Sequence, residues 1–136
     1  MAEMACTVLD TDLLIALLRG RKTAVDYVAR LEEEGLELAT TVVNLFELYY
    51  GAYRSGSEKR VRAIRELEEI LHVIGLDPRT AEAAAREAAR LASQGMSLGF
   101  RDVLIGVAAR EKGCRLATCN VKHLGRIEAL AVEKWC

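Results

Sequence analysis

Short apolar runs alternate with longer segments of helical periodicity along the chain. The short runs predict β-strands at residues 6–9, 36–40, 72–76, 115–117 and 131–132. The helical spacing predicts helices at 13–18, 24–34 and 42–53, from Ser57 through Leu71, from Pro78 to before Gly95, and at 101–112 and 121–125. Thr11 or Asp12 is expected to cap the first of these helices.

Strands and helices therefore alternate, and most connections between strands are long crossovers. This pattern predicts an α/β fold with helices on both faces of a mostly parallel sheet of about four to five short strands. The length of 136 residues fits a single domain, 1–136. In such sheets, functional sites form at the carboxyl ends of the strands, where the strand order reverses.

The composition, 51% hydrophobic and 29% charged, excludes a disordered chain or a fibrous repeat. No uninterrupted apolar run approaches the ~20 residues of a membrane helix. The first ten residues carry two acids and no basic residue, which is unlike a signal peptide. We therefore expect a cytoplasmic protein without a membrane segment.

The chain has 19 basic and 20 acidic residues, a net charge of −1, unlike a strongly basic nucleic-acid-binding protein. The balanced net charge does not exclude local patches of positive or negative charge. The densest basic stretch comprises Arg54, Lys59, Arg60, Arg62 and Arg65. It is either a solvated helix face balanced by neighbouring glutamates or a surface that binds phosphates.

Carboxylates in apolar surroundings are the most informative polar positions. Asp10 directly follows the first strand, where it is either a turn residue or part of a site. Glu47 lies in a helix that is apolar on nearly every side, and such a helix is expected to be buried. A buried carboxylate is costly unless it is paired or binds a metal. Glu47 is therefore either a metal ligand or half of a buried ion pair with an arginine.

Two further oxygen-bearing side chains lie near strand ends or helix starts. Asp102 opens an apolar helix, and Asn120 follows the fourth strand. Asp and Asn are also favoured at the start of a helix without any functional role, so a purely structural role is the alternative for both. We expect both to gather with Asp10 at the carboxyl edge of the sheet, with Glu47 projecting toward them. Hard oxygen ligands without an accompanying His or Cys cluster suit Mg²⁺ or Mn²⁺ rather than zinc.

Four segments, in this order, carry a resemblance to a known family. They are VLDTDLLIALL at 8–18, TVVNLFELYYGA at 41–52, GFRDVLIG at 99–106 and LATCNVKHL at 116–124. Together they cover essentially the whole chain, which resembles a PIN domain, specifically the VapC-type toxin ribonuclease of a toxin–antitoxin pair. The resemblance implies a three-layer PIN-like fold.

The resemblance also implies a Mg²⁺- or Mn²⁺-dependent endoribonuclease that hydrolyses phosphodiester bonds in single-stranded or looped RNA. Asp10 and Asp102 would be the principal metal ligands. Glu47 would ligate the ion or hold a metal-bound water, and Asn120 would orient that water, with the inverse roles of these two left open. Asn120 replaces an aspartate that is frequent in the family, which leaves open whether one or two ions bind.

Through the same resemblance, Thr118 matches a small hydroxyl residue that shapes the pocket. Arg101, Lys122 and Arg126 lie near the motif acids in sequence, so we expect them to contact RNA phosphates. The family implies a homodimer and a cognate antitoxin protein. Four aromatic residues share the helix of Glu47, where core packing, base stacking by one tyrosine and a dimer interface are the alternatives: Phe46, Tyr49, Tyr50 and Tyr53.

Two other functions remain as alternatives. A catalytically inactive PIN module that binds RNA or a protein partner is motivated by Asn120. A phosphohydrolase of the haloacid dehalogenase type is motivated by Asp10-Thr11-Asp12 after an apolar strand, but it leaves Glu47 without a role.

The four cysteines, Cys6, Cys114, Cys119 and Cys136, form no Cys-x-x-Cys pair, which excludes zinc-ribbon and thioredoxin sites. We expect thiols without a shared role in a reducing compartment. Asn and Gln are scarce, as in proteins of thermophiles, and disulfides are more frequent inside thermophiles than in other reducing compartments.

Overall fold

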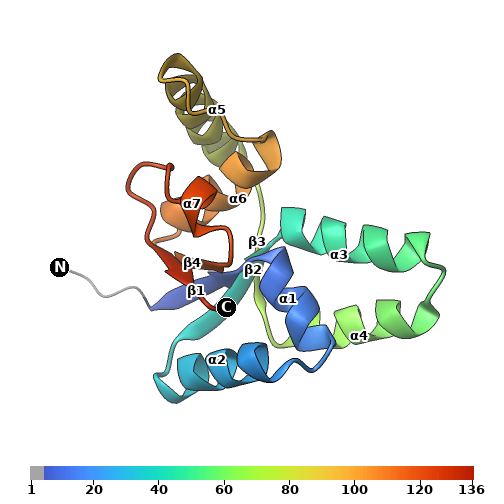
Figure 1. Ribbon diagram of the computed structural model, residues 1–136. Helices are drawn as coiled ribbons and strands as arrows, with labels where there is room; N and C mark the ends of the chain where they lie inside the picture. Colours follow the sequence, from blue (N-terminus) through green and yellow to red (C-terminus); the bar gives the residue numbers. More distant parts are fainter. Residues whose placement is uncertain (1–4) are drawn as a thin grey trace.

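The computed structural model describes residues 5–136 and contains one five-stranded sheet (Figure 1). Its strands are β1 (Cys6–Leu9), β2 (Glu37–Thr41), β3 (His72–Ile74), β4 (Arg115–Thr118) and β5 (Val132–Lys134). The spatial order is β3-β2-β1-β4-β5, and all four pairings are parallel. The prediction of an α/β fold with a parallel sheet of four to five strands is confirmed.

Seven helices connect the strands in the described part of the chain. They are α1 (Thr11–Leu18), α2 (Lys22–Glu33), α3 (Val42–Arg54), α4 (Glu58–Glu69), α5 (Pro78–Ser93), α6 (Phe100–Glu111) and α7 (Val121–Leu124). In Figure 1, α5, α6 and α7 lie on one side of the sheet and α1 to α4 on the other, which gives three layers. Within residues 5–136, no helix has the length and apolar character needed to cross a membrane.

Alternation along the strands builds a separate core on each face of the sheet. In β1, Val8 packs with α5 and α6, whereas its neighbour Leu9 packs with the helices of the opposite layer. In β4, Leu116 packs in the same core as Val8, and Ala117 packs in the same core as Leu9. Successive side chains of a strand point to opposite faces, so these apolar pairs fix which face each helix covers.

The strand order reverses beside β1, because β2 lies on one side of it and β4 on the other. The carboxyl ends of these three strands lead into Asp10, into α3 through Thr41, and into the loop after Thr118. The register pairs Val8 with Ala39 and Leu116, so the three ends meet at one edge of the sheet.

The start of α1 differs from the expectation. Asp10, rather than Thr11 or Asp12, is the N-cap, and its Oδ1 accepts a hydrogen bond from the backbone N–H of Thr11 at 2.9 Å. Asp12 lies inside the first turn, where its carboxylate is free to reach other elements. Asp77 caps α5, since its Oδ1 accepts a hydrogen bond from the Thr80 N–H at 2.8 Å, and Pro78 lies in the first turn.

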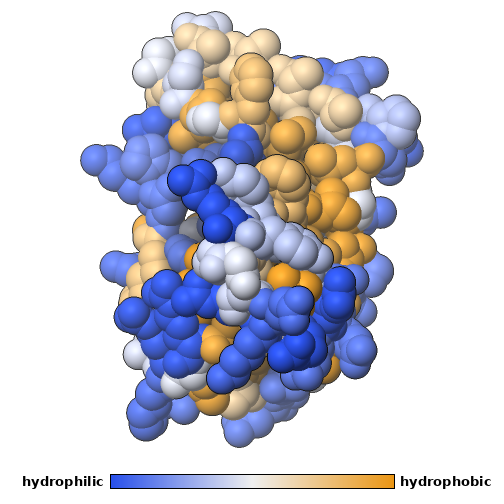
Figure 2. All heavy atoms as spheres, turned by 90° about the vertical axis from the view of Figure 1, so that its right-hand side faces the viewer, coloured by the Kyte–Doolittle hydropathy of each residue, from blue (hydrophilic) through white to orange (hydrophobic). Residues whose placement is uncertain are grey.

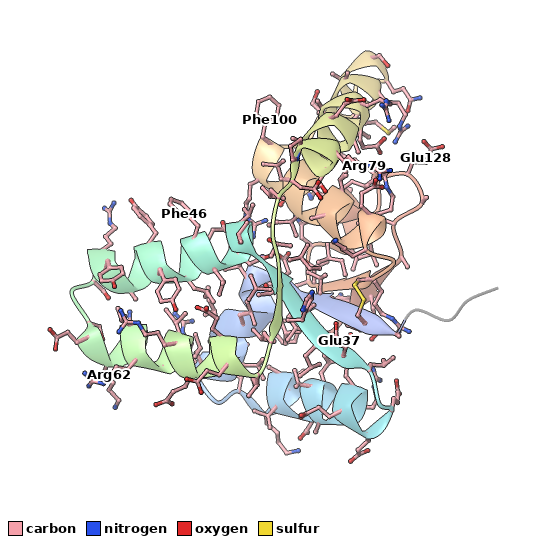
Figure 3. The ribbon with its side chains drawn as sticks, turned by 180° about the vertical axis from the view of Figure 1, so that it is seen from behind. Glu37, Phe46, Arg62, Arg79, Phe100 and Glu128 are labelled. Atoms are coloured by element: carbon pink, nitrogen blue, oxygen red, sulfur yellow. A yellow bond between two sulfur atoms is a disulfide. The ribbon has the colours of Figure 1, made fainter. Side chains whose placement is uncertain are left out.

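The prediction that α3 is buried on nearly every side is wrong. Only Asn44, Leu48 and Ala52 are buried on this helix, whereas Phe46 is 69% exposed. Figure 3 shows Phe46 pointing away from the ribbon. The helix lies over α1 and α4 with a single face, so its apolar character reflects an uncovered surface rather than burial in this chain.

The cysteines also differ from the expectation of unrelated thiols, because all four are paired. One disulfide joins Cys6 in β1 to Cys114 just before β4, with Cα atoms 4.9 Å apart. The other joins Cys119 after β4 to Cys136, with Cα atoms 5.7 Å apart. The parallel pairing of β1 with β4 brings the first pair together, which spacing along the sequence cannot reveal.

Candidate active site

Asp10 lies at the centre of the carboxyl edge of the sheet. Its backbone N–H donates to the carbonyl of Ala117 at 3.0 Å, which continues the β1–β4 ladder by one residue. Its side chain is 5% exposed. Oδ2 accepts from the Thr118 hydroxyl at 2.8 Å, and Oδ1 accepts from the Asn44 side-chain amide at 3.1 Å. Both carboxylate oxygens are therefore fixed by other elements of the fold.

Glu47 reaches the same edge from α3. It is half-buried, and its Oε1 accepts a hydrogen bond of 2.6 Å from the Thr11 hydroxyl. Asn44, one turn earlier in α3, donates to the same Thr11 hydroxyl at 2.9 Å. Asn44 is fully buried and also completes a capping box with Thr41 at the start of the helix. It therefore joins Asp10 to the Glu47 side of the site.

Asp102 enters from the first turn of α6, next to Arg101. The Arg101 guanidinium bridges all three acids: Nε donates to Glu47 Oε2 at 2.6 Å, Nη2 donates to Asp10 Oδ1 at 3.2 Å, and Nη1 donates to Asp102 Oδ1. We call Asp10, Glu47 and Asp102 the carboxylate cluster. Burial alone would lower the pKa of Arg101, but the hydrogen bond to Glu47 and the charge of Asp10 outweigh it and raise this pKa above its ordinary value.

The sequence predicts Glu47 either as a metal ligand or as half of an ion pair with an arginine, and the structure is compatible with both. The arginine partner is present, and it is shared with the other two predicted metal ligands. The described residues contain no group of three His, Cys, Asp or Glu side chains that is close enough as it stands to hold a metal ion. A guanidinium lies where their oxygens converge.

Thr118 and Asn120 follow β4, but only Thr118 contacts the carboxylate cluster. Thr118 is fully buried, and its hydroxyl accepts from the Asn120 backbone N–H at 3.0 Å while donating to Asp10. The side-chain oxygen of Asn120 is instead 2.7 Å from Nδ1 of His123. Lys122 is exposed on α7. The structure therefore brings five predicted residues together (Asp10, Glu47, Arg101, Asp102 and Thr118), while the Asn120 side chain turns to α7.

Asp12 forms a second junction near this edge. Its Oδ2 accepts from the Cys119 backbone N–H at 2.9 Å, and its Oδ1 accepts from the Trp135 indole at 3.1 Å. Asp12 is directed at Cys119 and Trp135, and among the described residues it forms no ion pair with Arg101, which bridges the carboxylate cluster. It is therefore not arranged beside Asp10 as the second acid of a DxD phosphohydrolase. That alternative has no support in the geometry.

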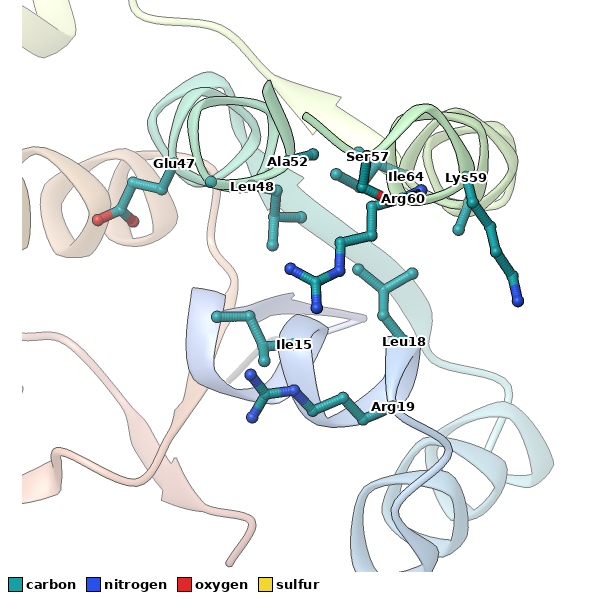
Figure 4. A pocket seen from close by; sticks show the side chains of 12 residues that line it. Ile15, Leu18, Arg19, Glu47, Leu48, Ala52, Ser57, Lys59, Arg60 and Ile64 are labelled. Atoms are coloured by element: carbon teal, nitrogen blue, oxygen red, sulfur yellow. Dashed lines mark hydrogen bonds between the residues drawn. The ribbon is translucent and has the colours of Figure 1, made fainter. Parts of the chain in front are cut away.

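A groove leads away from Glu47 between α1, α3 and α4 and has a volume of about 450 Å³ (Figure 4). Its apolar lining includes Ile15 and Leu48, and its basic lining comprises Arg19, Lys59 and Arg60. Part of the predicted basic stretch therefore borders the groove.

Residues 7–129 match the sequence profile of the PIN domain family. The chain belongs to the PIN domain family. A relative named ribonuclease VapC10, from Mycobacterium tuberculosis, is 34% identical over 125 residues, which cover 89% of this chain and 87% of the relative. The tRNA(fMet)-specific endonuclease VapC of Shigella flexneri is 29% identical over 128 residues, with 93% and 96% covered.

Solved structures agree with this assignment. The structure of VapBC-1 from nontypeable Haemophilus influenzae superposes on this PIN domain with a TM-score of 0.84 and 28% identity, covering 96% of this chain and 98% of that one. The resemblance drawn from the four motif segments is thereby confirmed.

Asn44 and the bridging role of Arg101 are the features of this PIN domain that sequence reasoning missed. Asn44 had a usable signal, because it precedes Glu47 by three residues and so lies on the same helix face. The sequence predicts a phosphate contact for Arg101, and its contact with Asp10, 91 residues away in sequence, has no local signal.

Proposed function

We propose that this PIN domain is the toxin ribonuclease of a VapBC-type toxin–antitoxin pair and hydrolyses phosphodiester bonds in single-stranded or looped RNA with Mg²⁺ or Mn²⁺. The observation that carries the proposal is the carboxylate cluster. Asp10, Glu47 and Asp102 come from segments far apart in sequence and converge on one cationic group at the carboxyl edge of the sheet. The names of the VapC relatives support the same reaction.

The donor chemistry of the cluster fits a hard divalent cation. All three side chains offer carboxylate oxygens, and a single positive charge from Arg101 offsets only part of their combined charge. Hard cations with octahedral preference bind such oxygens and keep several waters. We propose that Asp10, Asp102 and Glu47 hold the ion. When bound, it would supply an activated water and offset the negative charge that develops on phosphate.

The surrounding residues keep the carboxylates in place. Thr118 and Asn44 fix the two oxygens of Asp10, and Thr11 fixes Oε1 of Glu47. These hydrogen bonds are made by residues outside the cluster and do not depend on Arg101, so we propose that they hold Asp10 and Glu47 when an ion is bound as well. Asn120 is proposed to orient the attacking water, which requires its side chain to leave His123.

The groove beside Glu47 supports RNA as the substrate. Arg19, Lys59 and Arg60 provide positive charge next to an acidic centre that would otherwise repel a polyanion. Because one relative is named a tRNA(fMet)-specific endonuclease, we propose transfer RNA as the first substrate class to test. VapBC-1 as a structural neighbour supports an antitoxin protein as the partner.

The experiment compares the wild-type chain with Asp102→Asn on total transfer RNA and on a structured RNA pool, in Mg²⁺, in Mn²⁺ and in EDTA. We expect cleavage by the wild type in either metal, none in EDTA, and at least about a hundredfold loss in Asp102→Asn, because a ligand that stabilises transition-state charge is lost. Glu82→Gln, on the exposed surface of α5, is the control that leaves cleavage unchanged.

Absence of cleavage with every RNA, together with absence of Mn²⁺ binding by calorimetry, would favour the inactive PIN module. Metal-dependent cleavage that survives in Asp102→Asn would contradict the role given to that residue.

A further inference from the structure

One guanidinium occupies the centre of the carboxylate cluster. Arg101 uses a different nitrogen for each acid, and each acid lies on a different element: Asp10 after β1, Glu47 in α3 and Asp102 in α6. A planar fork of donors suits carboxylates better than the point charge of a lysine does. The bridge therefore neutralises part of the charge of all three acids at once.

The guanidinium uses the oxygens that a metal ion would need. Nη2 lies 3.2 Å from Asp10 Oδ1, and Nε lies 2.6 Å from Glu47 Oε2. Mg²⁺ binds such oxygens at about 2.0–2.1 Å and demands near-octahedral geometry. A guanidinium and an ion cannot both fill the space between the same oxygens. In agreement, the described residues contain no group of three His, Cys, Asp or Glu side chains that could hold a metal ion as they stand.

Arg101 is also placed so that it can leave. It is the second residue of α6, its side chain is 38% exposed, and it does not belong to either apolar core. The hydrogen bonds that Asp10 accepts from Thr118 and Asn44, and that Glu47 accepts from Thr11, do not involve Arg101. Displacement of Arg101 therefore requires a side-chain rotation at the surface rather than an opening of the fold.

We propose that Arg101 is an internal competitor of the divalent ion: its guanidinium holds the carboxylate cluster together in the metal-free protein and is displaced when the ion binds. The inference rests on the proposed metal-dependent function. Because the guanidinium and the ion compete for the same carboxylates, two consequences follow. Removing the guanidinium strengthens metal binding, and it destabilises the metal-free protein, because three acids are left without their cation.

The first test measures Mn²⁺ affinity by isothermal titration calorimetry in wild type, Arg101→Gln and Arg86→Gln. Arg86 lies on α5 with a 73% exposed side chain, so its variant matches the charge change away from the site. We expect Arg101→Gln to bind Mn²⁺ at least about fivefold more tightly than the wild type, within the range of typical coupling between two ligands. Arg86→Gln should match the wild type. Equal or weaker binding by Arg101→Gln would overturn the proposal.

The second test follows thermal unfolding in EDTA and in Mn²⁺. Arg101→Gln should unfold at a lower temperature than Arg86→Gln in EDTA and gain more from Mn²⁺ than the wild type does. An unchanged unfolding temperature in EDTA would contradict the bridging role. If Arg101→Gln does not fold, Arg101→Lys takes its place in both tests, because one ammonium cannot span three carboxylates, and it too should bind Mn²⁺ more tightly than the wild type.

A direct readout is the Nε–H cross-peak of Arg101 in a ¹H–¹⁵N spectrum, assigned by its loss in Arg101→Gln. The peak should shift on titration with diamagnetic Mg²⁺, and a peak that stays in place at saturating Mg²⁺ would overturn displacement. The two proposals fail differently. Equal Mn²⁺ affinity with metal-dependent RNA cleavage contradicts only the competition, whereas loss of cleavage in all metals contradicts the ribonuclease itself.

Discussion

The two oxygens of Asp10 are held by different elements, and Thr118 is the one that holds Oδ2. Replacing Thr118 with valine keeps the shape of this fully buried side chain but removes its hydroxyl. Asp10 Oδ2 and the Asn120 N–H then lose a partner. We expect Thr118→Val to lower the free energy of unfolding by about 1–3 kcal/mol and to reduce RNA cleavage. Urea denaturation and kcat/KM measure the two effects.

Thr7 provides a matched control in the same sheet. It is also fully buried, in β1, but its hydroxyl has no hydrogen-bond partner among residues 5–136. Thr7→Val removes a buried polar group that is unpaired, so stability should stay equal or rise. If both variants lost the same stability, the loss in Thr118→Val would come from packing rather than from the hydrogen bond to Asp10.

Residue identity alone predicted the members of the carboxylate cluster but not their contacts. The carboxylates were found because acids are unusual in apolar segments, and that signal is local. The bridge by Arg101 depends on β1, α3 and α6 meeting in space. Its only local trace is that Arg101 precedes Asp102 directly, a position that fits a phosphate contact equally well.

Among the helices, α5 is anchored to the chain after α7 by one buried carboxylate. Glu87 is 5% exposed, receives two hydrogen bonds from Arg90, and accepts from the backbone N–H of Glu128 at 2.8 Å. The hydrogen bonds from Arg90 lower the pKa of Glu87, burial opposes them, and the N–H of Glu128 adds to the lowering. This carboxylate therefore contributes stability in its ionised form.

The sign of the pH dependence follows from that shift. The unfolded chain takes up a proton at the ordinary glutamate pKa of 4.5, whereas the folded chain does so only at a lower pH. The stabilisation is complete above the ordinary pKa and is lost as the pH falls through the lowered one. We expect Glu87→Gln to cost about 1–3 kcal/mol near pH 7 and to show a smaller loss of unfolding free energy between about pH 5 and pH 3 than the wild type.

Denaturant unfolding over this pH range checks the prediction, with Glu82→Gln as the control. Glu82 is on the same helix and pairs with Arg86, but its side chain is 78% exposed, so screening by solvent should leave its acid dependence like that of the wild type. Parallel pH profiles for the wild type and Glu87→Gln would contradict the assigned role of Glu87.

The extents of the elements were predictable because their signals are periodic and local. The strands and helices lie close to the expected ranges, and the residues that cap α4 and α5, Ser57 and Asp77, are short polar residues directly before helical spacing. The exposure of α3 was not predictable in this way. Hydropathy shows that a side chain is apolar, but it does not show whether that side chain is buried by the same chain or by another molecule.

At the scale of the whole molecule, the disulfides are a second feature that local sequence signals do not predict. Cys6 and Cys114 are 108 residues apart, and only the parallel pairing of β1 with β4 makes them neighbours. The sheet order is in turn a property of the complete α/β arrangement. The four motif segments supplied this information indirectly, because a family resemblance carries a topology with it.

The fold does not explain one apolar surface that this chain leaves uncovered. Phe46, Tyr50 and Tyr53 of α3 are 69%, 53% and 63% exposed, and Phe100 at the start of α6 is 78% exposed. Figure 2 shows apolar residues gathered on part of one face of the molecule. Four exposed aromatic side chains on two helices that contact each other are unusual for a monomer and typical of an interface.

We expect this surface to pack against a second copy of the chain, as the family resemblance implies. Size-exclusion chromatography with light scattering should give twice the mass of 15.0 kDa for the wild type. Phe46→Ser should shift the protein toward the monomer, because a buried aromatic anchor contributes about 2 kcal/mol or more to an interface. Ile70→Ser, at a similarly exposed position after α4, is the control that should stay dimeric. A wild-type monomer at high concentration would contradict the homodimer and leave the antitoxin as the molecule that covers this surface.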